Sequence, residues 1–145
     1  MPEEICFYSR KDEYGWMSNF ECSAQFVDGH WYKSNEHYYQ SMKAKDSRAA
    51  RWIADAPTPY MAMITGRNLR PEDFVDNWDD IKVNIMLKGL RAKFKDSELQ
   101  EKLLSTGDAI LHEASPEDMF WGMNGEDMLG KLLMQVREEI RGGTT

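Results

Sequence analysis

The sequence predicts a helix-rich α+β domain with a few short strands. Apolar residues recur at three- and four-residue steps in several segments, whereas strand-like segments are few and short. The chain has 145 residues, which fits a single domain over 1–145, and such a chain buries roughly two thirds of its unfolded surface. Charged residues make up 30% and hydrophobic residues 41%, a composition typical of a globular protein.

The strand signals are concentrated in the first third of the chain. Strands are expected at residues 5–9, 24–27, 30–32 and 109–113. Asp28-Gly29 separates the second and third of these, and this dipeptide is typical of a two-residue type I′ hairpin turn. Residues 15–20 mix aromatic and small polar side chains without a clear period, so we expect a loop that carries function.

Helical periodicity and capping residues place the helices. They are expected at residues 35–45, 47–54, 60–66, 78–95, 97–106 and 126–141. Ser34 or Asn35 is suited to cap the first helix, and Ser97 to Gln100 has the pattern of a capping box that opens the fifth. Gly107 is expected at the C-terminal end of the fifth helix. Ser115 followed by Pro116 indicates a further helical turn.

Charge and cysteine content exclude several classes of protein. The formal net charge of −7 argues against nonspecific binding to a phosphate backbone. Cys6 and Cys22 are too few for a disulfide framework, so both are expected to be reduced and packed. None of the three histidines is paired with a cysteine, so we expect no metal and no cofactor.

The sequence gives no indication of a membrane or a secretory route. Residues 1–5 are acidic rather than basic, and no apolar run follows them. No stretch approaches the roughly 20 apolar residues that a spanning helix requires. We therefore expect a cytoplasmic protein.

The segment from Ser34 to Ala44 contains the most informative pattern. In a helix, Glu36, Gln40 and Lys43 lie along one stripe, so a carboxylate and an amine share a surface. Nearby aromatic residues are expected to provide the partly dry surroundings that acid–base or Schiff-base chemistry needs: Trp31, Tyr32, Tyr38 and Tyr39. The alternative is an ordinary helix with a solvated polar face and a buried aromatic face.

Two other features are candidates for anion binding. The backbone amides of Trp121 to Gly125, which precede the last helix, are suited to receive a phosphate or a sugar hydroxyl. Alternatively, Glu126 and Asp127 already satisfy the dipole of that helix. Arg67 can grip a phosphate with two hydrogen bonds, although a lone arginine is more often a surface residue.

Several carboxylates are possible acid–base partners, and their spacing does not show which converge. They are Glu36, Asp108, Glu113, Asp118 and Asp127. A serine hydrolase is poorly supported, because the chain has no Gly-x-Ser-x-Gly sequence. A Rossmann fingerprint is absent as well.

Taken in order, these segments resemble the NADAR superfamily, also called the YbiA-like family. The matching segments are Phe7-Tyr8-Ser9, Tyr14-Gly15, Ser18-Asn19-Phe20, Ser34-x-Glu36-His37-Tyr38-Tyr39-Gln40-x-x-Lys43, Gly66-Arg67, Trp78 with Lys82 and Met86, Ala92-Lys93-Phe94, Asp118-x-x-Trp121-Gly122 and Leu129-Gly130-x-x-Leu133-Met134-x-x-Arg137. Their order and their coverage of nearly the whole chain make the resemblance specific.

The resemblance implies a helix-rich α+β fold and hydrolysis of a ribose C1′–N bond. Some members of the family act on early riboflavin-pathway intermediates, which favours a substrate such as 5-amino-6-ribosylaminouracil 5′-phosphate. Others remove ADP-ribose from guanine bases, so an ADP-ribosyl hydrolase acting on nucleic acid is the first alternative. A module that binds ADP-ribose or a nucleotide without turnover is the second, and a helical interaction protein is the third.

The resemblance also implies site residues. Glu36 and Lys43 match the family's catalytic glutamate and lysine, and Asp118 is a third candidate catalytic residue. The candidate substrate-binding residues are Ser9, Gly15, Ser18, Asn19, Phe20, Arg67, Trp121, Gly122, Asn124 and Asp127. Among these, Asn19 is expected to position hydroxyls or water together with Asp118, and Phe20 and Trp121 to stack on the base or to form a wall of the pocket.

One segment departs from the family's pattern. The family has a longer glycine-rich loop that leads to Asn-x-Leu-Gly, whereas this chain has a short loop from Gly122 to Glu126 and Asp127 in place of the asparagine. A carboxylate there is expected to repel phosphate or to need a different hydrogen-bond partner. The substrate preference therefore depends on Asp127.

Overall fold

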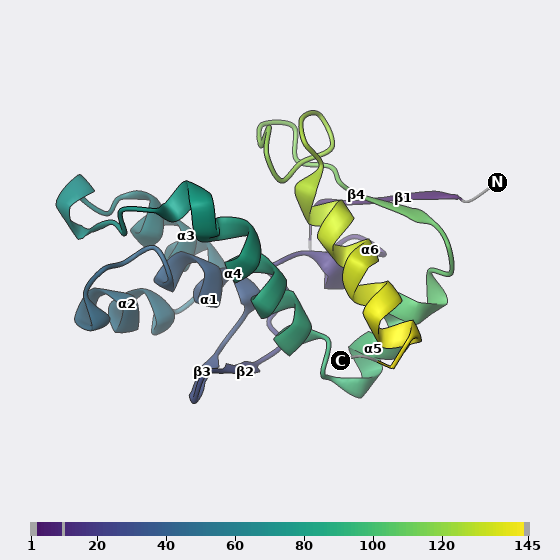
Figure 1. Ribbon diagram of the computed structural model, residues 1–145, viewed down its shortest axis with the longest axis horizontal. Helices are drawn as coiled ribbons and strands as arrows, with labels where there is room; N and C mark the ends of the chain where they lie inside the picture. Colours follow the sequence, from purple (N-terminus) through teal and green to yellow (C-terminus); the bar gives the residue numbers. More distant parts are fainter. Residues whose placement is uncertain (1–2, 10, 144–145) are drawn as a thin grey trace. The chain divides into compact units, whose positions relative to one another are not determined.

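The computed structural model describes residues 3–9 and 11–143 (Figure 1). The start of the acidic N-terminal segment, residues 1–2, lies outside the described residues. The strands are β1 (Glu4–Phe7), β2 (Gln25–Val27), β3 (His30–Tyr32) and β4 (Ile110–Glu113). The α-helices are α1 (Asn35–Ser41), α2 (Ser47–Ala54), α3 (Pro59–Arg67), α4 (Trp78–Lys93), α5 (Ser97–Ser105) and α6 (Met128–Arg141), and two 3₁₀ turns are η1 (Gly15–Met17) and η2 (Pro71–Asp73). The predicted helix-rich α+β class is confirmed.

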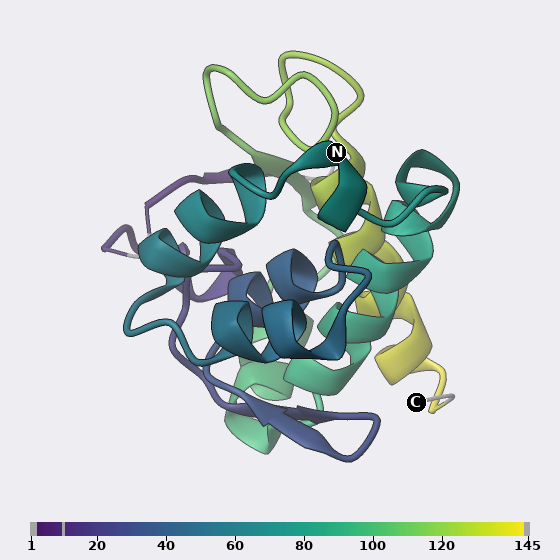
Figure 2. The same ribbon diagram turned by 90° about the vertical axis from the view of Figure 1, so that its left-hand side faces the viewer.

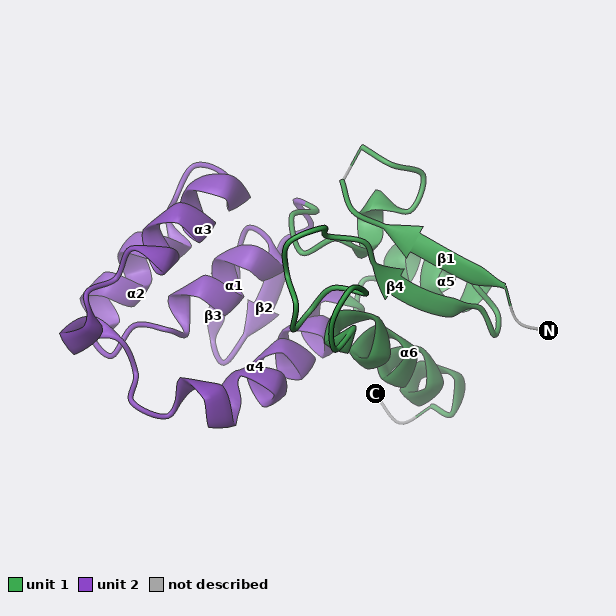
Figure 3. Cartoon of the chain, turned by 90° about the horizontal axis from the view of Figure 1, so that it is seen from above, with its two compact units in different colours: residues 1–21, 94–145 green, residues 22–93 purple. Residues whose placement is uncertain are grey.

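The chain forms two compact units, coloured separately in Figure 3. Unit 1 comprises the described parts of residues 1–21 and 94–145, and unit 2 comprises residues 22–93. The expectation of one domain over 1–145 stays a prediction. None of the described helices has the length and apolar character needed to cross a membrane.

The hairpin of unit 2 follows the sequence prediction. β2 and β3 pair antiparallel, with Val27 opposite His30 across the turn. Asp28 and Gly29 both have positive φ, at 50° and 86°, as a type I′ turn requires. The Asp28 carboxylate accepts a hydrogen bond of 2.6 Å from Lys88 on α4, which ties the turn to that helix.

Helix α1 is the centre of unit 2 and is buried on all sides. Ser34 caps it, since the Ser34 hydroxyl accepts a hydrogen bond from the backbone N–H of His37. The helix packs against α2, α3 and α4, which Figure 2 shows in blue to teal. Two glycines permit this close packing: a Cβ on Gly66 of α3 would overlap the side chain of Gln40, and one on Gly89 of α4 would overlap that of Asn35.

The predicted helix at 35–45 is too long. Regular helix ends at Ser41, and Lys43 lies in the turn that follows, where its backbone N–H donates to the Gln40 carbonyl at 3.2 Å. The chain then extends, and Ala44 forms a β-bridge with Phe74. The Ala44 N–H still donates to the Ser41 carbonyl, whereas the Lys45 N–H donates to the Asp73 carbonyl of the bridge in place of a helical hydrogen bond.

His37 fastens α1 to the rest of unit 2. Its side chain is fully buried, with Nε2 3.0 Å from the Ala56 carbonyl oxygen and Nδ1 2.7 Å from the Ser34 hydroxyl. A carbonyl can only accept, so Nε2 carries the proton and Nδ1 accepts from Ser34. Burial lowers the pKa of His37, which favours the neutral ring in this structural role.

Unit 1 is built on the parallel pair of β1 and β4, with His112 opposite Cys6. Helix α6 packs on β4, and Gly130 makes the contact possible because a Cβ there would overlap the Leu111 carbonyl. Cys6 and Cys22, one in each unit, are in no disulfide and are both exposed, so the expectation that they are packed is wrong.

Two helix starts in unit 1 differ from the predictions. The cap of α5 is Asp96, whose carboxylate accepts from the Leu99 N–H, so the capping box is wrong by one residue. Gly107 has a φ of +63° after α5, as predicted. Helix α6 begins at Met128 instead of Glu126, because Asp127 has left-handed backbone angles.

The predicted helical turn at Ser115 is not formed as a helix. Ser115 accepts hydrogen bonds from two following amides, but residues 114–127 form a loop without a helix.

Candidate active site

Glu36 lies in the first turn of α1 and is almost completely enclosed. Only 7% of its surface is exposed. Its Oε2 accepts a hydrogen bond of 2.8 Å from Nε2 of Gln40, one turn further along the helix. Gln40 is 3% exposed. The alternative of a solvated polar face is therefore wrong, since the stripe that contains Glu36 is buried.

Lys43 is half-buried in the turn after α1, over two aromatic rings. Its Nζ lies 5.4 Å from the centre of the Tyr39 ring and 5.8 Å from that of Trp78. These rings pack edge to face with their centres 5.1 Å apart. An ammonium group over ring faces is attracted by their negative potential. Lys43 thus has the partly dry, aromatic surroundings that were predicted for it, although only Tyr39 belongs to the predicted set.

The other predicted aromatics serve different purposes in unit 2. Tyr32 and Tyr38 are buried and pack against each other, with ring centres 5.3 Å apart. Trp31 is 66% exposed and pairs with Phe26 on the outer face of the hairpin. Trp78, from α4, takes the place beside Lys43 that we had assigned to these residues.

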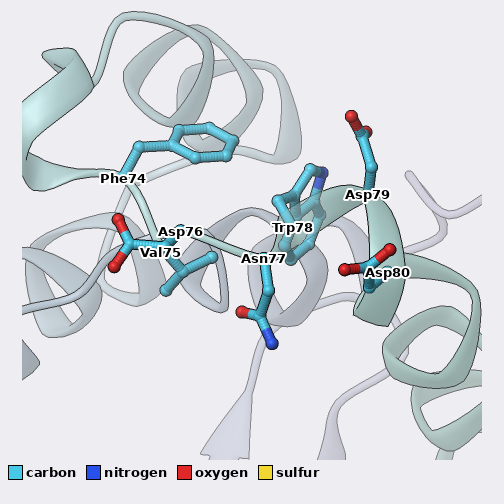
Figure 4. Close-up of a pocket in the computed structure, with 7 residues that line it drawn as sticks. All are labelled: Phe74, Val75, Asp76, Asn77, Trp78, Asp79 and Asp80. Atoms are coloured by element: carbon cyan, nitrogen blue, oxygen red, sulfur yellow. The ribbon is translucent and has the colours of Figure 1, made fainter.

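A pocket of about 520 Å³ borders Trp78 (Figure 4). It is lined by Phe74, Val75, Asp76, Asn77, Trp78, Asp79 and Asp80. The wall is joined to the Lys43 turn, because the Val75 N–H donates to the Lys43 carbonyl at 2.9 Å. Two of its carboxylates are paired with lysines, Asp76 with Lys45 at 3.0 Å and Asp79 with Lys82 at 3.2 Å. The pocket thus offers aromatic and polar surface next to the candidate catalytic lysine.

Unit 2 contains three of the predicted site residues: Glu36, Lys43 and Arg67. Arg67 is the last residue of α3 and is exposed, directly after Gly66. Since Gly66 packs on Gln40, the helix end that carries Arg67 is fixed relative to α1.

The remaining predicted residues belong to unit 1, and five of them lie in its N-terminal segment. Ser9 is exposed, and its backbone N–H donates to the Asp12 carboxylate at 2.9 Å. Gly15 is buried at the start of η1, and Ser18 is buried just after it. The Ser18 hydroxyl accepts from the Phe20 N–H at 3.1 Å, so it fixes the backbone around Asn19 and Phe20, both half-buried.

The loop before α6 holds the other predicted residues of unit 1. Oδ1 of Asp118 accepts from the backbone N–H groups of Phe120 and Trp121, at 3.0 and 2.8 Å. The amides of Gly122 and Gly125 also donate to carbonyls within the loop. These amides already donate hydrogen bonds within the loop and are not available to an anion, whereas the side chain of Trp121 is half-buried and that of Asn124 is exposed.

Three of the five candidate carboxylates converge in unit 1. Glu113, at the end of β4, is partly buried and has Asp118 and Asp127 as charged neighbours. Burial first, and then the charge of Asp118, raise the pKa of Glu113 to about 7. Its Oε1 accepts from the Ser115 N–H at 3.1 Å, while its Oε2 has no hydrogen-bond partner among the described residues. Glu113 thus exchanges a proton near neutral pH.

Asp127, which stands where the family has asparagine, has a hydrogen-bond partner in His112. Its Oδ2 lies 2.5 Å from Nδ1 of His112, whose Nε2 lies 2.9 Å from Oε1 of Glu4. Burial alone lowers the pKa of His112, but the hydrogen bonds to Asp127 and Glu4 outweigh it and raise the pKa. The raised pKa favours the charged form of His112, and a positive charge beside Asp127 weakens the repulsion between this carboxylate and an anion.

Glu113→Gln should make unit 1 more stable at high pH. Because its pKa is raised from 4.5 to about 7, Glu113 contributes stability that is present below pH 4.5 and is lost as the pH rises through 7. Glutamine keeps the shape and cannot ionise. The variant is compared with the unmodified protein by the difference in their free energies of unfolding. After allowance for solvent screening, we expect this difference to favour the variant by about 1 kcal/mol more at pH 8.5 than at pH 5. Denaturant unfolding at both pH values measures this, with exposed Glu117→Gln as control. An equal effect at both pH values would contradict it.

Sequence reasoning missed three residues that shape these surroundings. Trp78 was noted only as part of the family pattern, Glu113 only as one carboxylate among five, and His112 only as a histidine without a cysteine. Strand geometry was the available signal for Glu113 and His112, since successive side chains of β4 point to opposite faces, which places Leu111 and Glu113 on one face and His112 on the other.

The chain is similar in sequence to a protein family and to individual relatives. Residues 6–141 match the family model described as NADAR domain, a continuous range that includes residues of both units. The chain is 38% identical over 141 residues to N-glycosidase YbiA of Escherichia coli strain K12, covering 94% of this chain and 88% of that protein. It is 39% identical over 145 residues to an N-glycosidase of Nostoc punctiforme, covering 94% and 92%.

A plant relative and a solved structure extend the comparison. The chloroplastic riboflavin biosynthesis protein PYRR of Zea mays is 38% identical over 157 residues, covering 95% of this chain and 25% of that longer protein. The NMR structure of the E. coli protein YbiA matches with a TM-score of 0.87 and 37% identity, over 97% of this chain and 87% of that one.

Proposed function

The chain belongs to the NADAR domain family, and from that premise we propose that it is an N-glycosidase that hydrolyses a ribose C1′–N bond. Its relatives named N-glycosidase support this activity, and those named riboflavin biosynthesis proteins favour a riboflavin-pathway substrate. We propose 5-amino-6-ribosylaminouracil 5′-phosphate as a representative substrate. The observation that carries the proposal is the enclosed Glu36 carboxylate, followed seven residues later by Lys43 over two rings.

The reaction breaks the C1′–N bond and adds water to C1′. As the bond breaks, its electron pair goes to the nitrogen and positive charge develops on the ribose. We propose that the Glu36 carboxylate stabilises this charge and takes a proton from the attacking water, that the leaving nitrogen gains a proton from solvent, and that Glu36 then returns its proton to solvent. Lys43 either stabilises charge on the ribose hydroxyls, or its neutral amine displaces the leaving nitrogen at C1′ and the ring C1′–O bond opens to give a Schiff base. Water then hydrolyses the Schiff base and releases the sugar and the lysine.

Binding roles are proposed for each unit by itself. In unit 2, exposed Arg67 is suited to pair with phosphate, and the pocket beside Trp78 offers aromatic and polar surface close to Lys43. In unit 1, we propose that Trp121 and Phe20 stack on a base and that Asn19 and Asp118 position hydroxyls or water. The other proposed binding residues of unit 1 are Ser9, Gly15, Ser18, Gly122, Asn124 and Asp127.

The net charge favours a small metabolite over a nucleic acid. A charge of −7 opposes a long polyanion, although it leaves room for one modified base in a local basic pocket. An ADP-ribosyl hydrolase acting on guanine bases is therefore the second candidate, and a binding module without turnover is the third.

Product release separates these candidates. We expect the protein to release ribose 5-phosphate from 5-amino-6-ribosylaminouracil 5′-phosphate and to release no ADP-ribose from ADP-ribosylated guanosine or DNA. Release of ADP-ribose alone would replace the proposed substrate with the second candidate. If neither product forms from folded protein, thermal stabilisation by ADP-ribose would support the binding module, since a ligand at one hundred times its dissociation constant adds about 2.7 kcal/mol.

A further inference from the structure

The amide of Gln40 is satisfied on one side only. Its Nε2 donates to Oε2 of Glu36 at 2.8 Å, whereas its Oε1 is buried without a hydrogen-bond partner among the described residues. A buried amide oxygen without a partner is costly. An apolar side chain such as methionine would fill the same space without that cost, so packing does not explain the glutamine.

Gly66 of α3 makes room for this amide. A Cβ on Gly66 would overlap Oε1 of Gln40, and it would also approach the Gln40 Cβ to 2.9 Å. Rotation of the amide relieves only the first contact, because the Cβ is fixed to the helix backbone. Any larger residue at 66 thus displaces Gln40 or moves α3 away from α1.

The direction of the amide depends on the charge of Glu36. An ionised carboxylate only accepts hydrogen bonds, so Nε2 must face it, and Oε1 is left against Gly66. A hydrogen bond donated to a carboxylate favours its charged form over the protonated form. The same bond limits the rotation of the Glu36 carboxylate.

We propose that Gln40 is a positioning residue that keeps Glu36 ionised and fixed in direction, and that residue 66 is glycine because the Gln40 amide occupies the space of a side chain there. The inference rests on the proposed function and assigns Glu36 the role of a carboxylate that stabilises charge and accepts a proton, not that of a general acid.

Gln40→Met tests the role in catalysis. Methionine keeps the length of the side chain and removes the donor. We expect kcat to fall about tenfold, with KM changed less than about twofold, and the acidic limb of the pH–rate profile to move up by about one pH unit. Gln135→Met is the matched control, because Gln135 donates to Glu139 at 3.2 Å across one turn of α6 at an exposed position. Unchanged kcat and an unchanged profile in Gln40→Met would overturn the proposal.

Gly66→Ala tests the packing part. We expect a lower melting temperature and at least the activity loss of Gln40→Met. Gly142→Ala is the control, since a Cβ there meets no atom closer than 3.4 Å. In the double variant Gly66→Ala with Gln40→Ala, the melting temperature should recover partly toward that of Gln40→Ala, because the contact with Oε1 is removed while the contact with the Cβ of residue 40 remains, and activity should stay low. Additive losses of stability in the double variant would contradict the contact between these residues.

A carboxyl ¹³C NMR titration of Glu36 tests the inference without turnover, with Glu36→Gln to assign the signal. The midpoint for Glu36 should lie about one pH unit higher in Gln40→Met than in the unmodified protein. If the protein hydrolyses none of the substrates but the midpoint moves, the proposed function fails and the positioning of Glu36 by Gln40 stands. If hydrolysis occurs and the midpoint does not move, the inference fails by itself.

Discussion

Glu36→Gln should lower kcat by about 10³-fold, within the range of about 10² to 10⁴ that a positioned acid–base group contributes. Glutamine has the shape of glutamate but neither its charge nor its basicity, so it loses both the stabilisation of the ribose cation and the proton acceptor. Although Glu36 is only 7% exposed, the glutamine keeps an oxygen that can accept from Nε2 of Gln40, so the isosteric change should leave unit 2 folded. Initial rates at saturating substrate measure the effect.

A control variant and a measurement of ligand affinity are needed to interpret the activity of Glu36→Gln. Exposed Glu101→Gln on α5 is the control and should keep full activity. Ligand affinity of Glu36→Gln should stay within about threefold of the unmodified protein, because the interaction with Glu36 develops in the transition state. Retention of more than a tenth of the activity would remove Glu36 from the catalytic role.

Lys43→Met should lower activity by at least about 10²-fold. Methionine keeps much of the aliphatic length over the Tyr39 and Trp78 rings and removes the amine, so both proposed routes for Lys43 lose their reacting group. Lys45→Met is the matched control, because Lys45 lies two residues away, is exposed and pairs with Asp76. Equal activity in the two variants would exclude Lys43 from the reaction.

Lys43→Arg with borohydride trapping then separates the two routes. A guanidinium keeps the positive charge but does not form a Schiff base. Activity in Lys43→Arg, with no trapped adduct in the unmodified protein, indicates stabilisation by charge. Loss of activity in Lys43→Arg, with a sugar adduct on Lys43 after reduction, indicates the covalent route.

Local signals predicted the elements that depend on local chemistry. Helix α2 spans Ser47–Ala54 as expected, and Asp28-Gly29 forms its hairpin. The errors occur where distant residues compete with the local preference. The β-bridge from Ala44 to Phe74 ends the helical conformation early, and the hydrogen bond from His112 holds Asp127 outside α6. Neither partner is visible in a window of neighbouring residues.

In the candidate site too, local sequence predicted some features and distant residues determine the others. Helical spacing placed Glu36 and Gln40 on one stripe, and the structure joins them through a hydrogen bond. Spacing did not reveal that this stripe is buried. Its burial depends on helices α3 and α4, which pack against α1 at Gly66 and Gly89. The contact of Lys43 with Trp78 connects positions 35 residues apart in sequence, so only the folded chain shows it.

Helix α1, which contains Glu36, loses stability in acid because the buried His37 is neutral in the folded protein. Burial, opposed by the hydrogen bond to Ala56 and aided by Lys33, lowers the pKa of His37. Its contribution to stability is therefore present above the ordinary value of 6.5 and is lost as the pH falls through the lowered pKa. Acid thus weakens α1 by charging His37, whereas it favours the protonated Glu113 of unit 1. In acid, inactivation by loosening of α1 can precede global unfolding, so a fall in rate there reports protonation of a catalytic group only while α1 stays folded.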